Sequence, residues 1–291
     1  MFLPNAGRVA RVQLGVEAMK QIQSLDVLKD RFARTARMPV LFLGHGSPMN
    51  AIEDSEYSRS WQALGETLPR PNAILVVSAH WMTKGATLVD VSAVPRTIHD
   101  FYGFPQALFD VQYPAHGAPD LAKDVVSLLA SHHAEGDDTW GLDHGAWSVL
   151  TWLYPQADVP VFQLSIDMAK PLEWHLEIGR TLSALRDRGV LILGSGNIVH
   201  NLRAMHRGPA HDWATTFDTR FAERLAAGDM AALADASKMG PELRLSHPSL
   251  DHYLPALTVA GAADARDSLT FMNESIDLGA ISMRSFLFSA T

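Results

Sequence analysis

The sequence contains no cysteine. This absence excludes a disulfide framework, thiolate zinc sites, iron–sulfur clusters and cysteine nucleophiles. Any metal ion must therefore be held by histidine and carboxylate side chains. The chain also lacks any run of more than two lysines or arginines, and its formal charge is −8. Because phosphate binding needs a clustered basic face, we expect a small-molecule partner and no nucleic acid.

Long apolar stretches are missing as well. None approaches the roughly 18 residues that a membrane-spanning helix needs. The N-terminus lacks the charged-then-apolar order of a secretory signal. The sequence therefore favours a cytoplasmic protein with no membrane partner. It marks no interface between copies, so a monomer or a small homo-oligomer is expected.

The length of 291 residues and the hydrophobic content of 47% favour one large α/β domain. Residues 1–37 are basic and lack strand-like alternation, so they are predicted to be a leader outside the core. Part of this leader, at 24–33, has the spacing of a helix. Met19 is an alternative start, which would leave residues 1–18 outside the native protein. Residues 38–291 are predicted to form the functional domain.

Within that domain, short runs rich in Val, Ile and Leu alternate with longer amphipathic segments. This alternation predicts a layered α/β sandwich, with a central sheet that is mostly parallel or mixed and helices on both faces. Strands are expected at 39–43, 73–77, 87–91, 161–166, 190–193, 269–276 and 281–288. Helices are expected at 58–68, 120–132, 145–153, 171–188, 213–226 and 248–261.

The chain has thirteen histidines, and three of them directly follow predicted strands. These are His45, His80 and His200. In open α/β sheets ligands bind beyond the carboxyl ends of the strands, so three such imidazoles would converge if the strands were neighbours. Converging imidazoles indicate a metal site. A single histidine after a strand is more often a hydrogen-bonded structural residue, so the prediction depends on all three.

Two further histidines are candidates for the same site. His144 directly precedes a predicted helix, where it could act as a base or a hydrogen-bond donor. His252 lies at the start of the apolar segment 248–261. Four other histidines lie at a helix end or beside a Gly-Pro turn and are predicted to be solvated: His132, His133, His206 and His211.

Glycines flank two of the histidine segments. Gly44 and Gly46 surround His45, and Gly194 and Gly196 precede His200. We expect them to let the backbone come close to a bound ion or substrate. Neither segment is a dinucleotide fingerprint or a P-loop, so a nucleotide site is rejected.

Hydrolase motifs are also absent. Ser47 and Ser195 do not lie in a Gly-x-Ser-x-Gly elbow, and the chain has no His-Glu-x-x-His motif. The sequence therefore does not point to a serine hydrolase or to a zincin protease.

Residues 38–288 resemble the 4,5-DOPA extradiol dioxygenase family, within the class III extradiol ring-cleavage superfamily. The resemblance rests on six motifs in a fixed order along the domain. They are Gly44-His45-Gly46-Ser47-Pro48-Met49, Ser78-Ala79-His80-Trp81, His99-Asp100-Phe101-Tyr102-Gly103-Phe104-Pro105, Gly141-Leu142-Asp143-His144-Gly145-Ala146-Trp147, Gly194-Ser195-Gly196-Asn197 through His200-Asn201-Leu202, and Asp251-His252-Tyr253-Leu254-Pro255.

The resemblance implies a role for each matching histidine. His45 and His80 match two metal ligands, and His252 matches the third. His200 matches a histidine that is either a further ligand in a zinc-bound resting form or the base during turnover. His144 matches a histidine that faces oxygen and the substrate, so both His144 and His200 are candidate catalytic residues.

The implied cofactor is one divalent metal ion, and the implied reaction is extradiol ring opening. A catechol such as DOPA would be the substrate, and both atoms of O2 would be inserted. An all-imidazole ligand set suits Zn²⁺, whereas non-haem Fe(II) oxygenases usually offer two histidines and a carboxylate. We therefore expect Fe²⁺ to support ring cleavage and Zn²⁺ to occupy the purified protein.

The aromatic residues near these motifs have less specific roles. Tyr102 matches a loop beside the substrate and is a candidate substrate-binding residue. Trp81, Phe101, Phe104 and Trp147 could wall the substrate, although core packing suits most of them better.

Two alternative functions stay open. One is a zinc-dependent hydrolase that uses His200 as a base and needs no oxygen. The other is a non-catalytic metal-binding member of the same superfamily, because related folds need not keep the chemistry.

Overall fold

The computed structural model describes residues 35–290. The predicted helix at 24–33 of the leader lies outside this range. The last residues before the first strand are joined to the domain through Arg37, whose guanidinium lies 2.9 Å from Asp187 and 3.3 Å from Asp264.

An eight-stranded mixed sheet runs through the molecule in the order β4-β3-β5-β2-β6-β1-β10-β7. Its strands are β1 (Val40–Gly44), β2 (Ala73–Thr83), β3 (Thr87–Asp90), β4 (Ala134–Asp137), β5 (Val161–Asp167), β6 (Val190–Gly196), β7 (Asp267–Met272) and β10 (Ser285–Ala290). The four central strands β5, β2, β6 and β1 are parallel to one another. Because β10 and β7 pair antiparallel at one edge, the sheet is mixed. The strands β8 (Ile276–Asp277) and β9 (Ile281–Ser282) form a separate small ribbon.

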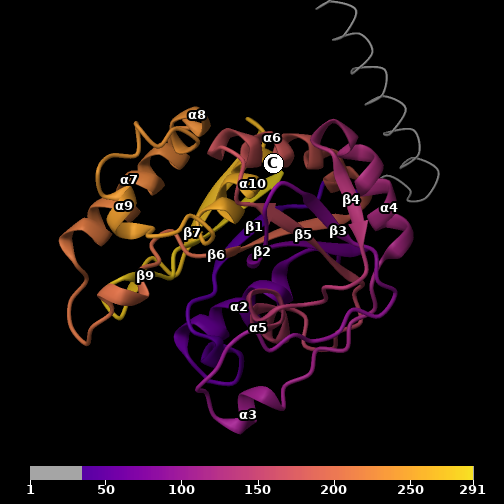
Figure 1. Cartoon of the computed structure of the whole chain (residues 1–291), viewed down its shortest axis with the longest axis horizontal. Helices are drawn as coiled ribbons and strands as arrows, with labels where there is room; N and C mark the ends of the chain where they lie inside the picture. The colour runs from indigo at the N-terminus through magenta and orange to yellow at the C-terminus, as the bar shows by residue number, and fades with distance from the viewer. Residues whose placement is uncertain (1–34, 291) are drawn as a thin grey trace, which may run out of the picture.

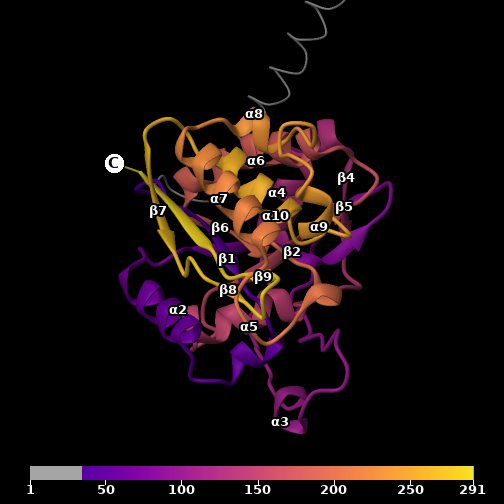
Figure 2. The same ribbon diagram turned by 90° about the vertical axis from the view of Figure 1, so that its left-hand side faces the viewer.

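Helices cover both faces of this sheet, as Figures 1 and 2 show. The longer helices are α2 (Glu56–Thr67), α4 (Pro119–Leu128), α5 (His144–Leu153), α6 (Leu172–Leu182), α7 (Asp212–Ala226) and α10 (Leu254–Ala262). The part of the chain that the structure describes also contains three single-turn α-helices: α3 (Gln106–Phe109), α8 (Met230–Leu233) and α9 (Leu243–Ser246). The predicted α/β sandwich is therefore confirmed. None of the helices within residues 35–290 is long and apolar enough to cross a membrane.

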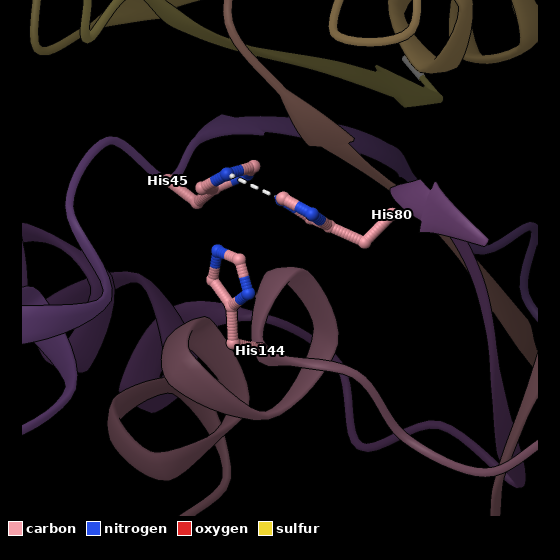
Figure 3. A group of neighbouring side chains, drawn as sticks. All are labelled: His45, His80 and His144. Atoms are coloured by element: carbon pink, nitrogen blue, oxygen red, sulfur yellow. Dashed lines mark hydrogen bonds between the residues drawn. The ribbon is translucent and has the colours of Figure 1, made fainter. Parts of the chain in front are cut away.

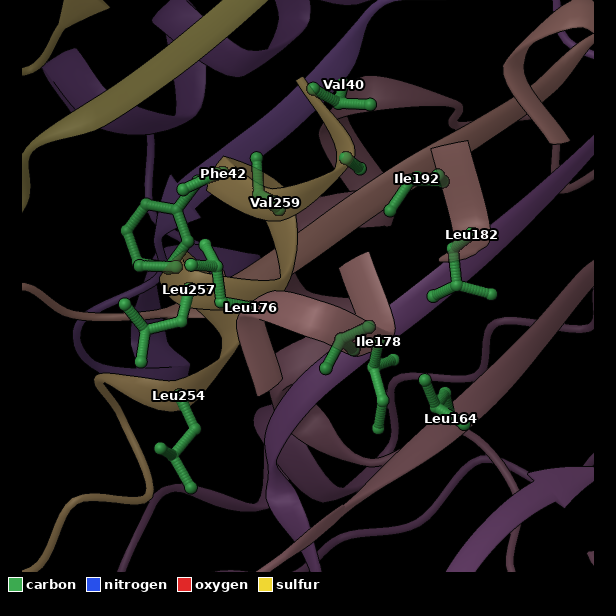
Figure 4. Close-up of a cluster of buried hydrophobic side chains, with 14 of the residues drawn as sticks. Val40, Phe42, Leu164, Leu176, Ile178, Leu182, Ile192, Leu254, Leu257 and Val259 are labelled. Atoms are coloured by element: carbon green, nitrogen blue, oxygen red, sulfur yellow. The ribbon is translucent and has the colours of Figure 1, made fainter. Parts of the chain in front are cut away.

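Strand β1 carries apolar side chains on both of its sides, so both faces of the sheet need to be covered by helices. Its side chains alternate, so Val40 and Phe42 belong to one buried cluster and Leu41 and Leu43 to another. The first cluster packs against α4, α6, α7 and α10, and Figure 4 shows part of it. The second packs against α2 and α5. A strand that is apolar on both sides needs two helical layers to remove it from water, which stabilises the fold by about 2 kcal/mol for each buried side chain.

Two glycines let α6 and α10 pack backbone to backbone. A Cβ atom on Gly179 would lie 2.0 Å from the carbonyl oxygen of Thr258, and one on Gly261 would lie 2.0 Å from that of Leu176. Only glycine permits this approach. The close packing holds α10 against β6, and thereby fixes the turn at His252 beyond the ends of the central strands.

Several predicted boundaries were wrong. The strand expected at 269–276 ends at Met272, and the one at 281–288 divides into β9 and β10. The chain turns between these pieces, where Asn273 and Leu278 have positive φ angles of 51° and 46°. The helix expected at 248–261 begins at Leu254, where Pro255 occupies a first-turn position that needs no backbone donor. Strand β4 was missed.

Candidate metal centre

Two of the predicted ligands meet at one edge of the sheet. His45 directly follows β1, and His80 lies in the last part of β2. Both strands are parallel neighbours of β6, so their carboxyl ends reach the same edge. The Nε2 atoms of the two rings are 3.2 Å apart, as the dashed line in Figure 3 marks. The predicted convergence of His45 and His80 is therefore present in the structure.

His80 lies inside a strand, whereas the sequence predicted it just beyond one. The pairing of β2 with β5 shifts register between Val77 and Met82, which spans the position of His80. Strand β2 thus continues as far as Thr83 with a local irregularity. The His80 side chain is 18% exposed, while His45 is buried.

His144 joins the pair from the opposite side, as Figure 3 shows. It is the first residue of α5, and its ring centroid is 3.8 Å from that of His80 and 5.5 Å from that of His45. One nitrogen from each of the three rings lies within 4.8 Å of the other two. The three imidazoles could hold a metal ion together, which makes His144 a possible ligand as well as the predicted base.

Asp143 fixes the start of α5 and hence the position of His144. Its carboxylate accepts hydrogen bonds from Ala146 N at 3.2 Å and from Ser78 Oγ at 2.6 Å. The Ser78 hydroxyl in turn accepts the backbone N–H of His80 at 3.2 Å. Burial raises the pKa of Asp143, and neighbouring Asp100 raises it further. One N-cap interaction therefore ties the helix that carries His144 to the strand that carries His80.

His200 and His252 form a second part of the site. Their rings stack with a centroid distance of 3.4 Å and an angle of 5°. The His252 ring centroid is 5.2 Å from that of His45 and 5.1 Å from that of His80. His252 therefore lies beside the cluster formed by His45, His80 and His144. His200 contacts this cluster through the ring of His252. His200, Asp251 and His252 also bring potential ligand atoms within 4.8 Å of one another.

In His45 and in His252, the ring nitrogen Nδ1 has an oxygen partner. Ser195 Oγ donates to the carbonyl oxygen of Gly145 at 2.5 Å, so at 3.0 Å it accepts from His45 Nδ1. His252 Nδ1 lies 2.6 Å from Asp251 Oδ2, and an ionised carboxylate can only accept. These partners assign the proton to Nδ1 in both rings and leave Nε2 with a free lone pair.

The carboxylate of Asp100 lies beside the Nδ1 atoms of His80 and His144. Its Oδ2 lies 3.2 Å from His80 Nδ1, and its Oδ1 lies 2.9 Å from His144 Nδ1. His144 Nδ1 has no hydrogen-bond partner in this geometry. Burial alone would raise the pKa of Asp100, but the nearby side chain and backbone of His144 and the adjacent ring of His80 lower it to about 2. Asp100 is therefore ionised at neutral pH.

His45, His80, His200 and His252 are held neutral. Burial lowers the pKa of His45 and of His252 well below the usual range, and the surrounding imidazoles lower both further. Burial likewise lowers the pKa of His80 to about 3 and that of His200 to about 4. Neutral imidazoles are the form that binds a metal ion, so no proton needs to be displaced from these rings at neutral pH.

Tyr102 is 92% exposed, so it is not packed against the cluster in this structure. Its predicted contact with substrate stays a prediction. The neighbouring Phe101 is nearer, with a ring centroid 5.6 Å from that of His144. Trp81 and Trp147 are buried, which agrees with the core role that the sequence favoured for most of these aromatics.

Two other sequence interpretations need correction. His133 and His206 are exposed as predicted, but His132 is half-buried against Trp174, and His211 is half-buried and stacks on Trp213.

The glycines beside the histidines allow other segments of the chain to approach closely. A Cβ atom on Gly196 would lie 2.2 Å from the carbonyl oxygen of His252, and one on Gly44 would lie 2.7 Å from the backbone of Met283. These glycines make room for other segments of the chain that build the site.

Sequence reasoning missed the carboxylates that support the imidazoles. Asp251 directly precedes His252, so the Asp-His pair was a usable local signal. Asp100 lies in a loop far along the chain from both His80 and His144, and only the fold brings it to them.

The fold and the cluster together define a class. This is an α/β protein with a histidine-lined site, suited to one divalent metal ion, at the carboxyl edge of its parallel strands. Residues 39–283 match the family described as the catalytic LigB subunit of aromatic ring-opening dioxygenase, and the chain belongs to this family.

Two known proteins that the chain resembles are named as dioxygenases. It is 49% identical over 265 residues to the 4,5-DOPA dioxygenase extradiol of Escherichia coli (strain K12), covering 89% of this chain and 97% of that protein. It is 36% identical to the protein of that name from Beta vulgaris, covering 86% and 96%. A crystal structure of an uncharacterized protein from Escherichia coli K12 superposes with a TM-score of 0.76 at 44% identity, covering 87% of this chain and 100% of that one. The family expected from the sequence motifs is confirmed.

Proposed function

We propose that this protein is a metal-dependent extradiol dioxygenase that opens the ring of a catechol such as DOPA and inserts both atoms of O2. The observation that carries the proposal is the 3.2 Å approach of His45 Nε2 and His80 Nε2. Family membership and the names of the relatives support the reaction and the class of substrate.

The donor set fits a divalent cation. If both Nδ1 atoms carry the protons, two Nε2 lone pairs face each other at 3.2 Å in a buried site. Lone pairs at this distance repel each other unless a cation or a proton lies beside them, and the lowered pKa of both rings disfavours a proton. A metal ion resolves the conflict, because neutral imidazole is a common metal ligand.

We assign His45, His80 and His252 as ligands. His200 is a further ligand when Zn²⁺ is bound, and a base when it is released. His144 is the base on the substrate side. The close approach of His144 to the ring of His80 supports a second assignment, in which His144 takes the third ligand place. The two assignments predict different behaviour for a His144 variant.

The chain's own groups would perform the proton steps. When bound, Fe²⁺ would supply Lewis acidity and a redox-active centre through which electrons from the catechol could reach O2. A catechol would approach from the side of His80 and His200, which are the more exposed rings. An unprotonated Nε2 on His144 or His200 would accept a proton from a substrate hydroxyl. Breaking the carbon–carbon bond beside the diol would leave a carboxylate and an aldehyde, which account for both oxygen atoms.

Metal exchange tests this proposal. Anaerobic reconstitution of metal-free protein with Fe²⁺ should restore oxygen-dependent opening of DOPA, whereas Zn²⁺ should bind in the same one-to-one ratio without restoring it. The reason is that Zn²⁺ has no accessible redox change. Stoichiometry is measured by elemental analysis, and turnover by the absorbance of the ring-opened product. Activity restored by Zn²⁺ and not by Fe²⁺ would overturn the proposal and favour the hydrolase.

A further inference from the structure

A buried ion pair joins helix α7 to the last part of the chain. Asp218 lies on α7, Arg284 directly precedes β10, and both are buried. Asp218 Oδ2 accepts from Arg284 Nε at 3.0 Å and from Arg284 Nη2 at 2.7 Å. Asp218 Oδ1 accepts from Ser282 Oγ at 2.6 Å, and Ser282 Oγ in turn accepts the backbone N–H of Arg284 at 3.2 Å. Both carboxylate oxygens therefore have a donor, and the Ser282 hydroxyl is held by both members of the pair.

Ser282 lies in β9 and is bound to the segment that carries His200. Its backbone N–H donates to Val199 O at 2.9 Å. Its neighbour Ile281 forms an isolated antiparallel bridge with His200 itself. The position of Ser282 therefore determines where the backbone of His200 lies.

Ser282 is also connected to the segment that carries His252. Its carbonyl oxygen accepts from Asn197 Nδ2 at 2.8 Å, and the backbone N–H of Asn197 donates to His252 O at 3.0 Å. Asn197 is buried and directly follows β6. Ser282 is thus connected by hydrogen bonds to the backbone beside both rings of the stacked pair, His200 and His252, whose centroids are 3.4 Å apart.

We propose that Asp218 is a positioning residue that acts through Ser282 to hold His200 and His252 in their stacked arrangement. Replacing a buried ion pair by apolar residues often leaves stability unchanged or increases it, so stability alone does not account for a pair at this place. Hydrogen bonds are directional, so the carboxylate fixes the Ser282 hydroxyl in one position, which an apolar contact would not do.

The consequence for the site rests on the proposed function, in which His252 is a metal ligand and His200 a further ligand or a base. The hydrogen bonds that hold the two rings do not rest on it. A shift of β9 would move both rings relative to His45 and His80, so metal binding would weaken although no ligand is lost.

A second buried ion pair provides a matched control. Arg186 and Asp267 are joined by hydrogen bonds of 2.6 and 2.8 Å, and both side chains are buried. Arg186 Nε donates to Met38 O at 2.7 Å. Met38 precedes β1, whereas His45 follows it, so this pair lies at the opposite end of the strand from the histidines. Its loss should lower stability without reaching the site.

The two pairs are compared in metal-free Asp218→Asn and Asp267→Asn proteins. The amide has nearly the size of the carboxylate, but it lacks the charge and one acceptor oxygen. Proton NMR of the histidine side chains reads the stacking, because parallel rings at 3.4 Å shield each other's protons. His200→Ala and His252→Ala proteins assign the signals. We expect the shielding to be lost in Asp218→Asn and kept in Asp267→Asn, while both variants melt at a lower temperature than the native protein.

A metal-binding measurement gives the second readout. Competition with a chelator should show Zn²⁺ bound about 10- to 100-fold more weakly by Asp218→Asn than by Asp267→Asn, the usual range for losing a group that orients a ligand. Native shielding or unchanged Zn²⁺ affinity in Asp218→Asn would overturn the inference. If the native protein binds no metal, the proposed function fails, and the shielding alone decides the inference.

Ser282→Ala repeats the test if Asp218→Asn does not fold, because it removes one hydroxyl and keeps the ion pair. Ser165→Ala is its control, since Ser165 is also buried and its hydroxyl accepts Leu88 N at 2.7 Å. We expect weaker shielding and weaker Zn²⁺ binding in Ser282→Ala and native values in Ser165→Ala. Native values in both variants would overturn the inference.

Discussion

Replacing His45 with alanine is expected to reduce divalent metal binding below detection and to remove oxygen-dependent turnover with it. His45 is buried, its Nδ1 is held by Ser195, and its Nε2 faces that of His80 at 3.2 Å. The substitution removes one of two nitrogens that already face each other. His80→Ala should have the same effect.

The measurement is anaerobic titration with Fe²⁺, followed by elemental analysis. His132→Ala is the matched control, because His132 is half-buried against Trp174 and contacts none of the site imidazoles. The control should bind one ion per chain. A His45→Ala protein that is folded by circular dichroism and binds Fe²⁺ with native affinity would remove His45 from the metal centre.

Replacing His144 with alanine should leave the metal bound and lower the turnover rate by roughly 10²-fold or more, the scale of general acid–base catalysis. His144 has its Nδ1 beside Asp100, which leaves Nε2 free to accept a proton. The expected result is native iron stoichiometry with a reduced kcat. Both quantities are measured on the same preparation, so loss of iron and loss of rate are separated.

The two assignments of His144 predict different results in this experiment. Loss of iron together with activity would make His144 the third ligand, as its 3.8 Å approach to His80 allows. Full activity with iron bound would remove His144 from the mechanism altogether.

The central part of the fold was predictable from the sequence because its strands are apolar on both faces. Runs such as 73–77 and 190–193 have no polar alternation, and they lie in the buried middle of the sheet. Strand β4 was missed because its sequence Ala-Glu-Gly-Asp has no β-branched or aromatic residue. It lies at the sheet edge, where pairing with β3 alone defines it. The antiparallel ribbon at the end of the chain also escaped prediction, because its strands are two residues long.

The sequence predicted histidines that the structure brings together, but not the carboxylates beside them. His45 and His80 could be found because each comes after a run of apolar residues, and the parallel strands that carry them flank β6 with their carboxyl ends on the same side. Asp100 could not be found in this way, because a carboxylate in a loop carries no periodic signal. Likewise, the exposure of Tyr102 depends on how its loop is held, which its sequence motif does not encode.

Oxygen consumption tests the central claim most directly. Anaerobically iron-loaded protein is mixed with oxygenated buffer and a panel of catechols that includes DOPA, while dissolved oxygen and the visible spectrum are recorded together. We predict uptake of one O2 for each catechol consumed, with the yellow colour of the ring-opened product. No uptake of oxygen from a protein whose iron site is fully occupied would contradict the account, and would favour a zinc hydrolase or a non-catalytic metal-binding protein.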